Sequence, residues 1–376
     1  EKRLLRTGTG MSTPNQLTVL ILGSGGREHA MAHRVQQSLL CSRLLVTPGN
    51  GGMPGEHFRV AVDDVPGIVS LCQEEKVDLV LVGPEVALAA GVVDALTAIG
   101  VKAFGPTKQL AEIESSKVYS RELAAQLGIP GPRFASFDKG AHQLAMAWWK
   151  QLDAPIVVKQ SGLAGGKGVV VPDNAAETEA AIFDACAVGQ VVLEEMLEGP
   201  ECSLMALCDG VTAVPLPIAQ DHKRIGEGDL GANTGGMGAY APVSVPYALD
   251  ELSATFIQPV IDHFARLGTP YKGVLYAGLM LTKEGPRLLE YNCRFGDPEA
   301  QVLLSLISTD LVEIALACVS GTLESVRVQT KPISAVAVVM TAAQYPLTPH
   351  IGDQILGVDD AGLYTNIFHG GTQKEN

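Results

Sequence analysis

The chain has 376 residues, 47% hydrophobic and 18% charged, so it can bury a large core and is not disordered as a whole. Its formal net charge of −14 argues against a broad nucleic-acid surface, which needs massed lysine and arginine. The seven cysteines form no CxxC pair, and no apolar run reaches the roughly 18 residues of a membrane span. We therefore expect a cytoplasmic protein with reduced thiols and with no membrane or nucleic-acid partner.

Strands and helices alternate through the first hundred residues. Residues 1–16 read as an upstream extension or an expression remnant, and 17–22 is a continuous apolar run typical of a buried parallel strand. The following elements are a helix at 27–38, strands at 43–47 and 78–82, and helices at 65–75 and 86–99. This order predicts an open, mostly parallel sheet whose ligands bind at the carboxyl ends of its strands.

The character of the sequence changes after residue 106, where we expect a mixed α+β arrangement. A helix at 115–127 ends at the Gly- and Pro-rich stretch 128–132, which is a strong boundary signal. Later elements are strands at 156–159, 168–171, 191–195 and 202–208, a long loop at 219–238, a helix at 251–267, a hairpin at 274–282 and 287–292, helices at 300–305 and 311–319, and a β-type run at 334–340.

The turn after the first strand, GSGGREH, resembles a dinucleotide fingerprint but has Glu28 in place of its last glycine. A strand, a Gly turn and a helix still form an anion site from backbone N–H groups. A phosphate of a small substrate fits this turn better than a dinucleotide. The alternative is that the glycines only make a tight turn.

Two later stretches suggest a nucleotide site. In KQSGLAGGKG, Lys159 and Lys167 flank a Gly-rich loop whose spacing is not that of a Walker A motif, and a mobile flap over a nucleoside triphosphate fits better than a solvated hairpin. Glu194 and Glu195 end a strand where an adenine edge and ribose hydroxyls could be held, although most such pairs are solvated surface.

The stretch LLEYNCRFGDPE carries the densest chemistry. Glu290 and Asn292 alternate along a strand, so they share one face and offer two hard oxygen ligands to a divalent cation. Arg294 follows at once and suits a carboxylate or a phosphate. The alternative for this stretch is a strand end with a polar solvent face.

In the long loop at 219–238, Lys223 and Arg224 could neutralise a triphosphate.

Together these stretches resemble the ATP-grasp superfamily and, within it, the glycinamide ribonucleotide synthetase family. The resemblance runs from about residue 17 to 373 through LILGSGGREHA, TPGNGG, LVGPEVALAAG, ESSK, VVKQSGLAGGKGVVV, QDHKRIGEGDLGANTGGMGAYAP, GVLYAGLMLTKEGPRLLEYNCRFGDPEAQ and IFHGGT. It implies an N-terminal α/β domain at 17–116, an ATP-grasp domain at 117–325 with a flap at about 133–197, and the start of a C-terminal domain at 326–376. Family members continue beyond this point, so we expect a truncated or abbreviated C-terminal domain.

The resemblance also implies the reaction: ATP-dependent joining of glycine to 5-phosphoribosylamine through glycyl phosphate, in de novo purine synthesis. It implies these roles: Lys117 and Lys159 on ATP phosphates; Glu194, Glu195, Met196, Leu197 and Glu201 around the adenosine; Lys223, Arg224 and Asn233 lining the nucleotide site; Glu290 and Asn292 on Mg²⁺ or Mn²⁺; Gly25, Gly26, Asn50 and Glu85 facing 5-phosphoribosylamine; Asp221 and Arg294 facing glycine. Arg294, Asp221 and Lys159 are the expected catalytic residues.

Two alternatives stay open from the sequence. One is another ATP-grasp ligase that uses a different acid or amine. The other is a nucleotide-binding module without turnover, which the short connection at 188–190 and the expected truncation make plausible. In many eukaryotes the family domain is fused to later purine enzymes, so such a fusion is a possible partner arrangement.

Overall fold

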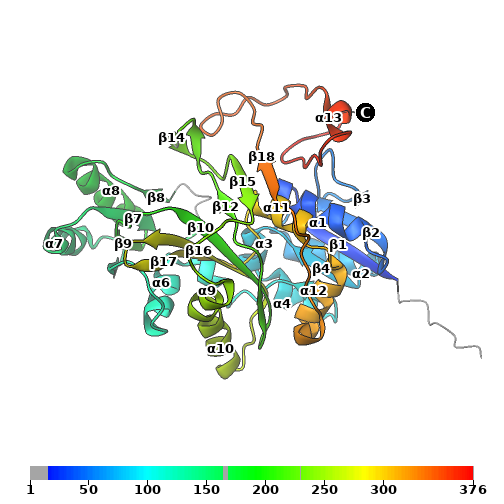
Figure 1. Ribbon diagram of the computed structural model, residues 1–376, viewed down its shortest axis with the longest axis horizontal. Coiled ribbons are helices and arrows are strands. Elements are labelled where there is room, and N and C mark those ends of the chain that lie inside the picture. Colours follow the sequence, from blue (N-terminus) through cyan, green and yellow to red (C-terminus); the bar gives the residue numbers. More distant parts are fainter. Residues whose placement is uncertain (1–15, 164–167, 229, 376) are drawn as a thin grey trace, which may run out of the picture.

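The computed structural model describes residues 16–163, 168–228 and 230–375 (Figure 1). Most of the extension expected at 1–16, and residues 164–167 of the expected flap loop with Lys167, lie outside these ranges. Within them, no helix combines the length and the apolar character needed to cross a membrane.

A five-stranded parallel sheet forms the N-terminal part, in the order β3-β2-β1-β4-β5. Its strands are β1 (Leu17–Gly23), β2 (Cys41–Pro48), β3 (Glu56–His57), β4 (Leu79–Val82) and β5 (Lys102–Phe104), and its helices are α1 (Gly26–Gln36), α2 (Val65–Glu74), α3 (Glu85–Ala90) and α4 (Val92–Ala98). Residues 19–22 of the central β1 are fully buried, as expected for a strand covered on both faces. The open parallel sheet predicted from the sequence is confirmed.

Two predicted helices are each broken in two. The helix expected at 86–99 divides at Gly91, whose φ of 93° is left-handed and ends α3 before α4 begins. The helix expected at 251–267 divides at Ile257 into α9 (Leu249–Phe256) and α10 (Gln258–Arg266). Pro259 lies in the first turn of α10, where its missing N–H costs nothing, but it cannot continue the preceding helix.

A small antiparallel sheet of order β6-β9-β7-β8 lies at one end of the molecule (Figure 1). It comprises β6 (Phe134–Phe137), β7 (Ile156–Gln160), β8 (Val169–Val170) and β9 (Val191–Glu195), with α7 (His142–Leu152) and α8 (Ala175–Val188). These two helices pack on each other and share a separate apolar core with the sheet, including Ala145, Ile156, Ile182 and Leu193. The two short helices α5 (Glu112–Ser115) and α6 (Lys117–Gln126) precede this sheet, and the Ser116 hydroxyl caps α6 at Tyr119 N (3.2 Å).

The central antiparallel sheet has the order β11-β10-β16-β17. Its strands are β10 (Glu201–Asp209), β11 (Ala213–Pro215), β16 (Lys272–Thr282) and β17 (Gly285–Asn292). The predicted hairpin is confirmed, because β16 and β17 pair antiparallel from Thr282 opposite Gly285.

The segment 219–238, predicted as a loop, contains short strands instead. It forms β12 (Gln220–Asp221), β13 (Arg224–Gly226), β14 (Leu230–Asn233) and the start of β15 (Gly238–Ala241), and β15 also pairs with β18 (Ala335–Val338). Strands of two to four residues are too short to show a period of two in the sequence. Glycines at left-handed positions, such as Gly228 (φ 68°) and Gly231 (φ 88°), turn the chain between and within them.

Helices α11 (Glu299–Leu306) and α12 (Leu311–Ser320) join the central sheet to the N-terminal one. The 3₁₀ turn η1 (Leu323–Ser325) follows α12, and the short helix α13 (Val358–Gly362) lies near the C-terminal end with no buried residue. Helix α11 packs on α1, and one apolar core contains Val19 and Ile21 of β1 together with Leu303 and Ile314 of α11 and α12. The polar stretch after β17 is thereby held against the carboxyl edge of the parallel sheet.

Candidate functional site

A bulge in β17 sets the position of two oxygen-bearing side chains. Glu290 lies opposite Gly278 but Leu288 lies opposite Leu279, so Leu289 is the extra residue. Beyond the bulge, Glu290 and Asn292 are two residues apart and share a face of the strand. Among the described residues no three His, Cys, Asp or Glu side chains gather as a metal site. The pair therefore suits a cation such as Mg²⁺, which takes one or two protein ligands and fills its shell from phosphate and water.

Three lysines act on Glu290. Burial by itself raises the pKa of this carboxyl, but the charges of Lys223, Lys159 and Lys117 outweigh burial and hold the pKa below its ordinary value. Lys117 also donates from Nζ to the carbonyl of Gly162 (3.1 Å). The structure thus places Lys117, Lys159 and Lys223, which the sequence analysis assigned to the nucleotide phosphates, around Glu290, which it assigned to a metal ion.

Asp221, the last residue of β12, and Lys223, two residues after it, act on the same group of charged side chains. Lys223 Nζ lies 3.1 Å from Glu201 Oε2 and acts electrostatically on Glu290. Burial raises the pKa of Asp221; Glu299 and Glu201 act in the same direction, and Lys223 opposes them. These effects together raise the pKa of Asp221 to about 7, and a substrate ammonium group beside it would stabilise its charged form.

Arg224 and Asn233 lie opposite each other on the β13–β14 hairpin, which projects from the body of the molecule (Figure 1). Arg224 Nη1 donates to the carbonyl of Gly231 (2.8 Å), and Asn233 is exposed. A cavity of about 420 Å³ lies between this hairpin and the β15–β18 pair. The two residues stay predicted nucleotide contacts, now placed on a projecting hairpin.

Glu194 lies in a buried ion-pair cluster. Its carboxylate accepts from Arg121 at Nε (3.0 Å) and Nη2 (2.9 Å), and lies 2.9 Å from Lys159 Nζ. Arg121 and Lys159 also donate to the carbonyl of Leu289, which the bulge frees from the β-ladder, at 2.7 and 2.9 Å. By contrast the next residue, Glu195, pairs with exposed Arg133 (2.9 Å). Half-buried Met196 and Leu197 follow it.

The glycine turn at the start of α1 already carries carboxylates. Glu28 Oε2 accepts from Gly25 N (2.6 Å), which is the glutamate half of a capping box. Asp297 Oδ2 accepts from Arg27 N (3.4 Å), and a Cβ on Gly25 would lie 2.7 Å from the Glu28 carboxylate. Gly25 and Gly26 stay predicted contacts of the amine substrate, in a turn that already holds the carboxylates of Glu28 and Asp297 and the guanidinium of Arg27.

Asn50 ties three segments together with its side-chain amide. Its Nδ2 donates to the carbonyls of Ser24 (2.9 Å) and His369 (2.7 Å), and its Oδ1 accepts from the backbone of Gly52 and Met53 (3.0 and 3.1 Å). These four contacts use the amide's hydrogen-bonding capacity. Asn50 is thus suited to shape the predicted 5-phosphoribosylamine site rather than to touch the substrate through its amide.

His29 holds the same C-terminal segment from α1. Its Nδ1 accepts from the backbone N–H of His369 (2.8 Å), and its ring packs edge-on against Phe368. Burial, with the neighbouring His369 and His33, lowers the pKa of His29 to about 4. The ring is therefore neutral near pH 7, as an acceptor at Nδ1 requires.

This lowered pKa makes stability depend on pH. An unfolded histidine titrates near 6.5, so between pH 6.5 and 4 the unfolded chain binds more protons than the folded one, and the free energy of unfolding falls as the pH falls. We expect His29→Asn to flatten this slope in denaturant titrations between pH 7 and 5, and exposed His350→Asn to leave it unchanged. An equal slope in wild type and His29→Asn would contradict the assignment.

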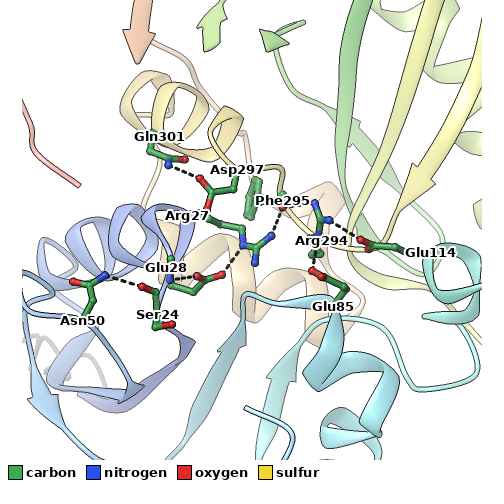
Figure 2. A network of polar contacts seen from close by, with 11 residues as sticks. Ser24, Arg27, Glu28, Asn50, Glu85, Glu114, Arg294, Phe295, Asp297 and Gln301 are labelled. Carbon is green, nitrogen blue, oxygen red and sulfur yellow. Dashed lines mark hydrogen bonds and ion pairs between the residues drawn. The ribbon is translucent and has the colours of Figure 1, made fainter. Parts of the chain in front are cut away.

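Arg294 lies between two carboxylates from separate elements (Figure 2). Its Nη2 donates to Glu114 Oε1 (2.6 Å) and to Asn292 Oδ1 (3.3 Å), and its Nε donates to Glu85 Oε2 (3.2 Å). The chain therefore joins the metal-ligand candidate Asn292, the glycine candidate Arg294 and the amine-substrate candidate Glu85 in one network. Sequence reasoning did not single out Glu114, although it lies in the ESSK stretch beside Lys117.

Two family models match the chain. The N domain of phosphoribosylglycinamide synthetase matches residues 17–114, and the ATP-grasp (A) domain of the same enzyme matches residues 115–300. The chain is 45% identical over 368 residues to phosphoribosylamine--glycine ligase of Mesorhizobium japonicum, covering 95% of this chain and 86% of that relative.

Two further comparisons agree. The chain is 44% identical over 371 residues to the trifunctional purine biosynthetic protein adenosine-3 of Gallus gallus, covering 94% of this chain and 37% of that protein. The crystal structure of phosphoribosylamine--glycine ligase from Thermotoga maritima superposes with a TM-score of 0.75 at 32% identity, covering 89% of this chain and 83% of that one.

Proposed function

The chain belongs to the phosphoribosylglycinamide synthetase family, and from that membership we propose that it joins glycine to 5-phosphoribosylamine, giving glycinamide ribonucleotide, ADP and phosphate in purine biosynthesis. One observation of the site carries the proposal. Three lysines suited to a triphosphate and an arginine suited to a carboxylate meet at the end of β17. Phosphorylation of an acid by ATP needs both groups at one place.

The reaction requires positioning rather than a side-chain nucleophile. A carboxylate oxygen of glycine attacks the γ-phosphorus in line, the bond to ADP breaks, and glycyl phosphate forms. The amine of 5-phosphoribosylamine then attacks the carbonyl carbon, phosphate leaves, and the amine gives up a proton. In this proposal Arg294 orients the glycine carboxylate, Asp221 holds the glycine ammonium, and Lys117, Lys159 and Lys223 neutralise the phosphates.

The remaining site assignments complete the proposal. Glu290 and Asn292 would hold Mg²⁺ or Mn²⁺, and the cation would supply charge neutralisation to the triphosphate. The adenosine is surrounded by Glu195, Met196, Leu197 and Glu201. Arg224 and Asn233 lie over the nucleotide. Glu194 acts on this site only through its ion pairs with Arg121 and Lys159. Gly25, Gly26 and Glu85 face the ribose and amine of 5-phosphoribosylamine, and Asn50 shapes their loop.

We propose the same division of the chain as the sequence suggested: 17–116 for the amine substrate, 117–325 for ATP with a flap at 133–197, and 326–376 as a third part. The parallel sheet, the small sheet from β6 to β9, and the family-model limits at 114 and 115 support the first two parts.

ADP release tests the proposed function. We expect ADP only when ATP, a divalent cation, glycine and the amine are all present, with ribose 5-phosphate and ammonia supplying 5-phosphoribosylamine in situ. Alanine in place of glycine is the control for the acid. ADP release independent of glycine would overturn the proposal, and tight ATP binding without turnover would favour a nucleotide-binding module.

A further inference from the structure

The two carboxylates on Arg294 are not held equally. The contact with Glu114 is short, 2.6 Å, whereas the contact with Glu85 is 3.2 Å (Figure 2). The side chain of Glu114 is 8% exposed and that of Glu85 is 24% exposed. Shorter charge-assisted hydrogen bonds are the stronger ones, so Glu114 is the firmer partner.

Glu114 has a second anchor beside its ion pair. Its Oε2 accepts from the backbone N–H of Cys293 (2.7 Å), one residue before the arginine itself. Burial raises the pKa of Glu114, and the charge of Arg294 opposes this rise. Removing Arg294 from Glu114 would leave a buried carboxylate without its compensating charge, which is strongly unfavourable.

Glu85 has an alternative cation. The charges of Arg294 and Arg27 both lower its pKa against the effect of burial. Arg27 is itself fixed, because its Nε pairs with Glu28 and its Nη1 donates to the carbonyl of Phe295 (3.1 Å). If Glu85 moved off Arg294, the charge of Arg27 would therefore still act on it.

An acid substrate brings a third carboxylate to this guanidinium. Three carboxylates cannot share one cation without strong repulsion, and a carboxylate is best held by two N–H donors. We propose that the substrate carboxylate replaces Glu85, and not Glu114, on Arg294, and that the displaced Glu85 receives the amine of the second substrate. This inference rests on the proposed function, in which Arg294 faces glycine and Glu85 faces 5-phosphoribosylamine. Glu114 is then a positioning residue for Arg294.

The exchange predicts opposite effects for two similar substitutions. Glu85→Gln removes the competing charge, so glycine should bind more tightly, with its Kd lower by on the order of fivefold, while the KM for the amine rises. Glu114→Gln loosens Arg294, so the Kd of glycine should rise on the order of tenfold or more. Exposed Glu112→Gln, on the same helix as Glu114, should change neither. Calorimetric titration with glycine and steady-state KM values measure these effects.

Each outcome decides the inference. A purely structural role for both carboxylates would weaken glycine binding in both variants, and that result overturns the exchange. Unchanged glycine binding in Glu85→Gln overturns it too, and this variant serves even if Glu114→Gln does not fold. If wild-type protein shows glycine-dependent ADP release while either result holds, only the exchange fails. If wild-type protein shows no glycine-dependent ADP release, the proposed function and the exchange fail together.

Discussion

Glu290→Gln should lower kcat by roughly 100-fold or more, the scale on which removal of one transition-state electrostatic contact acts. The substitution keeps the shape of the side chain but removes the charge that three lysines face and that a divalent cation would use. Folding should change little, because Glu290 is half-buried at a polar strand end and its replacement by glutamine removes no apolar packing.

Steady-state turnover at saturating ATP and Mg²⁺ measures this effect. Glu284→Gln is the matched control, since Glu284 is exposed in the turn of the same hairpin. It should turn over at the wild-type rate. A Glu290→Gln protein with near-normal kcat at saturating Mg²⁺ would remove the basis for placing the cation at β17.

Glu194→Gln should destabilise the fold strongly, by about 3–5 kcal/mol, the cost of breaking a buried ion pair. The carboxylate compensates Arg121 and Lys159, which are buried with it and which link α6 and β7 to β17 through the Leu289 carbonyl. Without it, two buried cations face each other. We expect the thermal unfolding midpoint to fall by several degrees.

The neighbouring residue gives the control. Glu195→Gln removes the same charge one position along β9, but its partner Arg133 is largely exposed, and exposed pairs contribute little. The unfolding midpoint should therefore hardly change. If Glu194→Gln melted like wild type and only raised the KM for ATP, Glu194 would be a nucleotide ligand, as its strand-end position suggested.

The contrast between these two glutamates shows where sequence reasoning stops. Adjacent residues of a strand point to opposite faces, so one of the pair had to face the protein. The choice of Glu194 over Glu195 depends on Arg121, which lies 73 residues earlier in the chain. It also depends on the bulge at Leu289, which no local sequence pattern marks. The strand itself was predictable, because its apolar run is continuous.

The shared face of Glu290 and Asn292 was predictable for a local reason. Glu290 and Asn292 lie on one strand of a hairpin with a clear period, and alternation alone puts them on one face. The carboxylates at the glycine turn were not predicted, although a glutamate at the third helical position, Glu28, is a known capping signal. The link between His29 and His369 spans 340 residues, and no local rule predicts it.

The fate of the glycine oxygens tests the central claim most directly. With both carboxylate oxygens of glycine labelled by ¹⁸O, attack on the γ-phosphate places one labelled oxygen in the bridge of glycyl phosphate, and it leaves with the phosphate when the amine attacks. We expect one ¹⁸O atom in each phosphate released, detected by mass spectrometry, with the other retained in the amide product. Phosphate without ¹⁸O, formed in step with the amide, would contradict carboxylate activation at this site.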